Sequence, residues 1–191
     1  AVYPADAFES NENGTLTVNV PNWQDGNFAS ANIAVAKTTL TDLNFQFKNV
    51  CGYVLMELSN ENIRKVTLEA EGQVVAGKVP VSFDSNGNLT YGEVIDGSSE
   101  VSAYFANAGQ CVISVLPNLS FASGVGITFA DSNAEFISST TLKQGYTLTR
   151  GGILNTKNID DAISINYYAT VAGAGKKDGS SWANAWDKAG L

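Results

Sequence analysis

Hydrophobic and polar residues alternate with a period of two in short runs along most of the chain. The alternation is regular over residues 15–20, 65–70 and 78–83, where every second side chain is apolar or nearly so. A period of two places these side chains on one face of a β-strand, so each run predicts a strand with one buried face. Further strands are predicted at 31–38, 43–58, 100–106, 110–116, 125–130 and 145–154.

The run at 43–58 changes its alternation near Gly52. Apolar residues occupy odd positions up to Phe47 and even positions from Val50 onward. This slip predicts a bulge or a bend, and the doubly apolar segment 50–58 predicts a central strand covered on both faces. Pro80 has no backbone N–H to donate, so its strand is expected at a sheet edge or with a bulge.

Turn signals separate these runs, and helical periodicity is almost absent. Asn86-Gly87 and Asp96-Gly97 are typical of hairpin turns. Short strands at regular spacing predict an all-β fold made of two packed sheets or a barrel, and an antiparallel β-sandwich is the simpler of the two. We expect this β-sandwich domain to span residues 1–166.

The pattern changes in the last part of the chain. Residues 167–171 are strand-like, 173–179 form a glycine-rich loop, and Trp182 and Trp186 lie at helical spacing after two serines that suit a helix start. Residues 167–191 are therefore predicted to be a strand-loop-helix appendage, the truncated start of a second module.

Composition and charge exclude several classes of function. The 191 residues are 44% hydrophobic and 16% charged, which predicts a folded chain. A net charge of −8 disfavours nucleic acid as a partner. The complete absence of histidine removes Ser-His-Asp and Cys-His nucleophile arrangements and every histidine zinc site. No apolar run approaches the roughly 20 residues that a transmembrane helix needs.

Neither a cofactor nor a metal is expected, and no pair of the 19 acidic residues is singled out as catalytic. Cys51 and Cys111 have apolar neighbours, and two buried thiols are favoured over a disulfide. Residues 84–88 resemble the first half of a calcium loop, but Ile95 stands where the bidentate glutamate is needed, which favours an ordinary hairpin turn. Asp160-Asp161 is interpreted as a turn or capping pair.

Three tryptophans are candidates for stacking on sugar rings. Trp182 and Trp186 share one helical face, which favours burial. Trp23 follows Pro21 and Asn22 and precedes Gln24 and Asp25, so it is expected in a polar, exposed segment. Trp23 is therefore the candidate glycan contact.

Short apolar motifs follow one another in a fixed order over roughly residues 1–160. They are the FKN-type strand at 43–52, IRKVTL at 63–68, VAGKV at 75–79, ISVLP at 113–117, and YTL at 146–148 with ILN at 153–155. No single motif is diagnostic, but their order and spacing resemble the fimbrillin-like family of Gram-negative surface proteins, which includes fimbrial subunits and fimbrial anchor or tip proteins.

The resemblance implies an antiparallel β-sandwich of transthyretin-like, Greek-key type. It also implies export as a lipoprotein to the outer membrane, display on the cell surface, and assembly with other surface or fimbrial subunits by β-strand donation. Residues 167–191 resemble the start of a right-handed parallel β-helix module of the pectate-lyase-like kind.

The function expected from these observations is non-catalytic: a cell-surface domain for adhesion or for fimbria-type assembly and display. The alternative is an accessory module of a glycan-binding or glycan-degrading surface protein whose β-helix follows Leu191. A polymerising fimbrial subunit is a third interpretation, and it lacks support from a maturation site because no arginine precedes Arg64.

Overall fold

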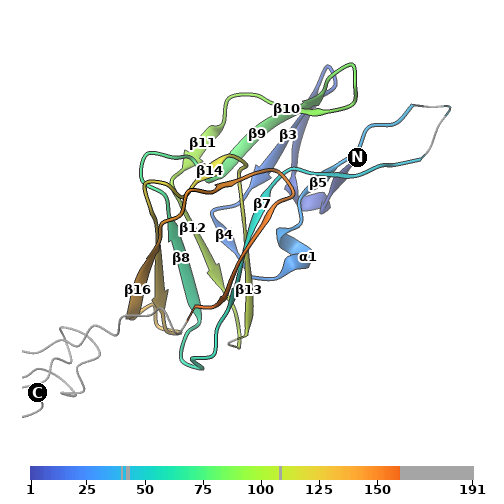
Figure 1. Ribbon diagram of the computed structural model, residues 1–191. Coiled ribbons are helices and arrows are strands. Elements are labelled where there is room, and N and C mark those ends of the chain that lie inside the picture. Colours follow the sequence, from blue (N-terminus) through green and yellow to red (C-terminus); the bar gives the residue numbers. More distant parts are fainter. Residues whose placement is uncertain (40, 42–43, 108, 160–191) are drawn as a thin grey trace, which may run out of the picture.

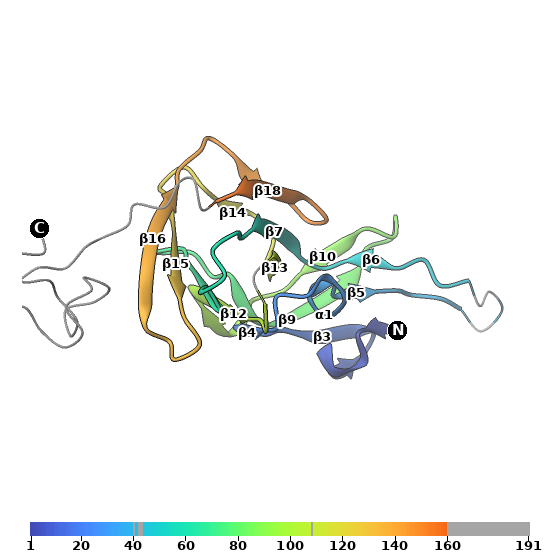
Figure 2. The same ribbon diagram turned by 90° about the horizontal axis from the view of Figure 1, so that it is seen from below.

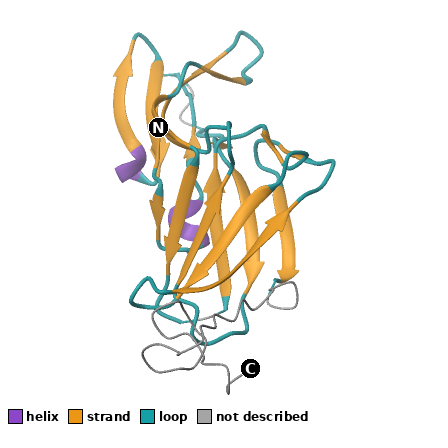
Figure 3. Ribbon diagram, turned by 90° about the vertical axis from the view of Figure 1, so that its left-hand side faces the viewer, coloured by secondary structure: helices purple, strands orange, loops and turns teal. Residues whose placement is uncertain are grey.

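The computed structural model describes residues 1–39, 41, 44–107 and 109–159 (Figure 1). The described chain is all-β, as predicted. Figure 3 shows that strands make up most of it and that its helical segments are short. These helical segments are the 3-10 turn η1 (Ala5–Ala7) and the helix α1 (Phe28–Ala31). Within the described residues, no helix has the length and apolar character that crossing a bilayer requires.

Two five-stranded sheets hold most of the strands. The first sheet has the order β10-β9-β3-β2, with β11 also paired to β9. Its strands are β2 (Phe8–Glu12), β3 (Thr15–Val20), β9 (Ala76–Phe83), β10 (Leu89–Tyr91) and β11 (Ile95–Ser98). The second sheet has the order β16-β15-β8-β12-β4. Its strands are β4 (Trp23–Gln24), β8 (Lys65–Glu69), β12 (Glu100–Tyr104), β15 (Val125–Ala130) and β16 (Phe136–Leu142).

Three smaller sheets complete the described part. The first contains β1 (Val2–Tyr3), β5 (Ala34–Val35) and β6 (Lys48–Asn49). The second contains β13 (Gln110–Val115), β7 (Gly52–Glu57) and β18 (Ile153–Asn158), with β18 parallel to β7. The third contains β14 (Leu119–Ser120) and β17 (Thr147–Leu148).

The strands β7 and β13 form a wall between two hydrophobic core clusters. Val54 and Met56 belong to the cluster that the second sheet covers, whereas Tyr53 belongs to the cluster that the first sheet covers. Figure 2 shows β7 and β13 in the middle of the molecule, with β15 and β16 on one side and β10 on the other. The prediction that 50–58 contains a central strand covered on both faces is confirmed.

Gly52 marks the end of one pairing and the start of another. The strand β6 ends at Asn49 and β7 begins at Gly52, which accounts for the slip in alternation. A Cβ atom on Gly52 would lie 2.7 Å from Cγ of Leu148, so only glycine allows β17 to approach this closely.

Three predicted strands are broken or much shorter than expected. In the described part of the segment 43–58, only β6 and β7 are strands, and residues 44–47 lie outside any strand. The segment 31–38 contains only β5, because the chain before it forms α1, whose first turn is capped by the Asn27 side chain accepting a hydrogen bond from the N–H of Ala29. The segment 145–154 is split by a turn, in which Gly152 donates to the carbonyl of Thr149, into β17 and β18.

Of the two alternatives predicted for Pro80, the edge strand is wrong, because β9 lies inside the first sheet. The bulge agrees with the pairing beside Pro80: from the pair of Val81 with Tyr91 to the pair of Lys78 with Ile95, β9 advances three residues while the facing chain advances four. The N and C=O of one residue in an antiparallel ladder point to the same side. The Pro80 carbonyl accepts from Gly92, so its nitrogen faces the place where β10 ends and β11 has not begun. The missing donor therefore falls in a gap between two successive partners of β9.

The predicted hairpin turn at Asp96-Gly97 is also wrong. Both residues lie within β11, where the register against β9 shifts between Ile95 and Ser98. Asp96 has φ +53°, in the left-handed region that aspartate adopts more readily than most residues, and this conformation allows the β-bulge here.

Two hairpins of the same design close β9–β10 and β15–β16. Each begins with Asp-Ser-Asn, at 84–86 and at 131–133, and the aspartate Oδ1 accepts from the backbone N–H groups two and four residues later, at 2.7–2.9 Å. The fourth residue of each loop is left-handed, with φ +75° at Gly87 and +61° at Ala134. The hairpin predicted at Asn86-Gly87 is confirmed.

The predictions for the last part of the chain concern residues beyond the described ones. They are the appendage at 167–191, its boundary at residue 166, the pair Asp160-Asp161, and the helical face of Trp182 and Trp186.

Candidate functional site

Trp23 lies on β4, the short edge strand of the second sheet. This strand runs parallel to β12, with Trp23 opposite Ser102, and the N–H of Ser102 donates to the carbonyl of Asn22 at 2.8 Å. Side chains of an edge strand have a neighbouring strand on one side only. Trp23 is 57% exposed, the largest exposed fraction among the large hydrophobic side chains described.

One face of the Trp23 indole is supported by Tyr104 of β12. The two rings are stacked, with centroids 5.4 Å apart and planes 15° from parallel. Lys65 of β8 pairs with Tyr104 in the sheet and places its Nζ 5.2 Å from the Trp23 ring centroid and 5.8 Å from that of Tyr104. Stacking and the cation–π contacts hold the indole in one orientation while more than half of the Trp23 surface stays exposed.

The neighbouring residue Gln24 anchors β4 from the opposite side. Its amide donates to the carbonyls of Ser114 and Pro21, at 2.8 and 3.0 Å, and its Oε1 accepts from the N–H of Ser114 at 2.9 Å. The side chain thus pairs with β13 as a strand backbone does. Gly26, at φ +70°, then turns the chain so that its carbonyl accepts from Val112.

A cavity of about 320 Å³ has Trp23 in its lining, whereas Tyr104 and Lys65 do not line it. Its apolar wall includes the buried residues Ala7, Ala31 and Ile33, and its polar side chains come from η1, β3, β4, α1 and β13 and from Asp25. The lining residues are Pro4, Asp6, Ala7, Asn19, Pro21, Trp23, Gln24, Asp25, Ser30, Ala31, Ile33 and Ser114.

The polar groups of this cavity differ in how far they are already engaged. Asp25 Oδ1 accepts from the N–H of Asn27 at 2.9 Å and from the hydroxyl of Ser30, while its second oxygen accepts no hydrogen bond within the described residues. Gln24 has both ends of its amide occupied. Asp6 and Asn19 make no side-chain hydrogen bond within the described residues, so their oxygens and nitrogen are available to a ligand.

The Asp84 carboxylate of the loop at 84–88 accepts its hydrogen bonds from within the same loop. Asp84 accepts bonds from Asn86 and Asn88, and the backbone hydrogen bond from Asn88 lowers the pKa of Asp84 below its ordinary value of 3.8. The hairpin interpretation is confirmed. Across the residues that the structure describes, no three His, Cys, Asp or Glu side chains are grouped so that they could hold a metal ion.

Cys51 and Cys111 are free and buried, which agrees with the favoured interpretation. Burial raises the pKa of each thiol to about 12. A thiol with so high a pKa is not a nucleophile at neutral pH.

The sequence identified Trp23 but not Tyr104, Lys65 or Asp6. These residues are 17 to 81 positions away from Trp23 along the chain, and no local sequence pattern predicts that they lie near it. Only the order β8-β12-β4 brings the first two beside Trp23. Comparisons of the chain with protein-family models, curated proteins and solved structures give no match.

Proposed function

We propose that this chain is a non-catalytic adhesion domain that binds carbohydrate beside Trp23. The observation that carries the proposal is an exposed indole, held by Tyr104 and Lys65, that lines a cavity with both apolar and polar side chains. An indole face is flat and apolar and suits the C–H face of a sugar ring. The carboxylates of Asp6 and Asp25 and the amide of Asn19 suit the hydroxyl groups at its edge.

Preorganisation favours binding at this place. A side chain that is already held in one orientation loses little conformational entropy when a ligand arrives. Trp23 is held by two ring contacts and β4 by the Gln24 amide. The cavity walls come from η1, β3 and α1, which pack on the cluster covered by the first sheet.

We further propose a fimbrillin-like, transthyretin-type sandwich, exported as a lipoprotein and displayed on the outer membrane of a Gram-negative bacterium. The order of the sequence motifs and the all-β chain with two core clusters support this proposal. The alternative role, an accessory module of a glycan-degrading surface protein whose β-helix follows Leu191, uses the same Trp23 site and rests on the resemblance of 167–191.

Assembly by strand donation is a second candidate function. In the described part of the chain, β2 and β16 each pair on one side only, which leaves a row of backbone groups on the other side. Such an edge accepts a donated strand from another surface or fimbrial subunit. Titration with peptides copied from β2 and β16 tests this, and no binding to either edge would contradict it.

The carbohydrate proposal is tested by replacing Trp23. A glycan array selects a saccharide, and calorimetry then compares the original chain with Trp23→Ala, Trp23→Phe and Phe45→Ala. Phe45 is the matched control because its ring is also exposed, at 49%, and belongs to the arm between β5 and β6 (Figure 2). We expect Trp23→Ala to weaken binding at least about tenfold, Trp23→Phe to weaken it less, and Phe45→Ala to leave it unchanged. Equal losses in Trp23→Ala and Phe45→Ala, or none, would contradict the proposal.

A further inference from the structure

A second hollow lies next to the Trp23 cavity on the first sheet. Its volume is about 290 Å³, and it shares Asn19 and Pro21 with the first cavity. The remaining lining residues are Val20, Asn22, Gly77, Lys78, Asp96 and Ser98. Since the same two residues line both hollows, the two spaces are neighbours.

The strand pairing explains why the hollows meet at Asn19. Val18 and Val20 are buried in the core, so Asn19 between them lies on the opposite, outer face of the first sheet. Asn19 stands opposite Lys78 in the ladder of β3 and β9. Asn19 therefore lines both hollows, and its ladder partner Lys78 lines only the second.

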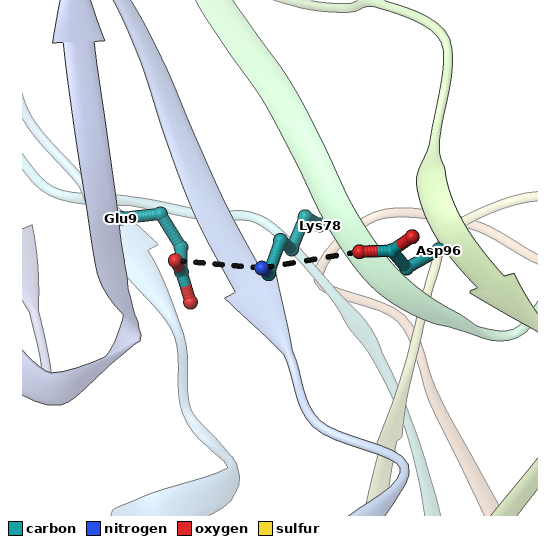
Figure 4. Close-up of polar contacts among 3 residues, drawn as sticks. All are labelled: Glu9, Lys78 and Asp96. Atoms are coloured by element: carbon teal, nitrogen blue, oxygen red, sulfur yellow. Dashed lines mark ion pairs between the residues drawn. The ribbon is translucent and has the colours of Figure 1, made fainter.

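Lys78 is held between two carboxylates. Its Nζ lies 3.8 Å from Oε2 of Glu9 and 3.9 Å from Oδ2 of Asp96 (Figure 4). At these distances the ammonium keeps room for a further acceptor, because neither contact is a short hydrogen bond. The second hollow has no aromatic side chain in its lining, and its hydrogen-bonding side chains are Asn19, Asn22, Lys78, Asp96 and Ser98.

The charges along both hollows disfavour an acidic ligand. Asp6 and Asp25 line the first cavity, and Glu9 and Asp96 flank the single ammonium of Lys78 in the second. The whole chain carries a net charge of −8. A uronate or a sialic acid would meet repulsion in both hollows and from the protein as a whole.

We infer that the ligand is an uncharged oligosaccharide that stacks one ring on Trp23 and extends across Asn19 into the hollow beside Lys78. This inference rests on the proposed carbohydrate function. The first hollow supplies the apolar platform, and the second supplies donors and acceptors for hydroxyl groups. A single sugar ring fills only one of them, so affinity increases with chain length until both are occupied.

The test is a length series. Neutral homo-oligosaccharides of glucose, galactose, mannose and N-acetylglucosamine, from one to six units, are titrated by calorimetry beside uronate oligomers of the same lengths. We expect affinity for one neutral series to rise at least about tenfold from the monosaccharide to the trisaccharide or tetrasaccharide and then to level off. In Lys78→Met most of this rise is lost, whereas the control Lys143→Met, on an exposed loop residue, retains it.

The outcomes separate this inference from the proposed function. A monosaccharide that binds as tightly as the longest oligomer overturns the two-hollow inference and leaves the carbohydrate function standing. Uronate oligomers that bind as well as neutral ones overturn the charge argument. If no saccharide of either series binds, the proposed function fails and this inference fails with it.

Discussion

Gly87 and Ala134 occupy the same position in two hairpin turns of the same design, and both have a left-handed backbone, at φ +75° and +61°. Exchanging the two residue types measures what this conformation costs. A Cβ atom at Gly87 would have no heavy atom within 4 Å, and Ala134 is exposed. Neither substitution therefore creates a clash or a cavity, and only the backbone preference changes.

The magnitude follows from two opposing contributions. An alanine in the left-handed region costs about 1–2 kcal/mol relative to glycine. The greater freedom of glycine in the unfolded chain offsets about 0.4–1 kcal/mol of this. We expect Gly87→Ala to lower the free energy of unfolding by about 1 kcal/mol and Ala134→Gly to raise it by a similar amount.

Urea denaturation followed by circular dichroism measures both variants. The midpoint should shift in opposite directions with an unchanged slope, and the melting temperature should move by about 2–4 °C for each kcal/mol. The double variant should return close to the original stability, because the two turns close hairpins of different sheets and do not share partners. If Ala134→Gly destabilises the protein while Gly87→Ala does not, the shared design of the two turns is refuted.

Two further predictions concern single polar side chains. The Ser138 hydroxyl is buried without a hydrogen-bond partner in the described chain, so Ser138→Ala should raise the free energy of unfolding by about 1 kcal/mol in urea denaturation. The control Ser102→Ala removes the partner of the Thr67 hydroxyl and should lower the free energy of unfolding. A loss of stability in Ser138→Ala would contradict this prediction. The folded-state pKa of Asp84 is lowered by the backbone hydrogen bond from Asn88, so its contribution is fully present above its ordinary value of 3.8 and is lost as pH falls through the lower folded value. Stability measured between pH 5 and pH 2 should therefore fall less steeply in Asp84→Asn, and identical profiles would refute this.

The alternation of apolar and polar residues predicted those strands that have one face on the hydrophobic core and the other toward solvent. The run 15–20 became β3 because Val18 and Val20 pack on the core while Asn19 meets solvent. The strand predicted at 31–38 is reduced to the two residues of β5, because Asn27 caps a helix that ends at Ala31. A capping side chain competes with strand pairing over a few residues. The second Asp-Ser-Asn hairpin was not predicted, since Ala134 lacks the glycine that usually marks such a turn.

Trp23 could be selected from the sequence because its neighbours are polar, so it belongs to no run of apolar residues that would form a buried face. Its contacts with Tyr104 and Lys65 could not be predicted. Tyr104 and Lys65 reach it through the pairing of β8, β12 and β4, and strand order depends on which faces pack together across the whole molecule.

The sequence by itself determined that the chain is all-β, that it is acidic, and that histidine chemistry plays no part in it. These properties follow from side-chain periodicity and composition, which need no knowledge of distant residues. Only the tertiary structure decided that Pro80 lies inside a sheet and that β7 and β13 divide two cores. It also decided that two hollows meet at Asn19. Each of these depends on contacts between segments far apart in the chain, and their free energy depends on packing that no local pattern encodes.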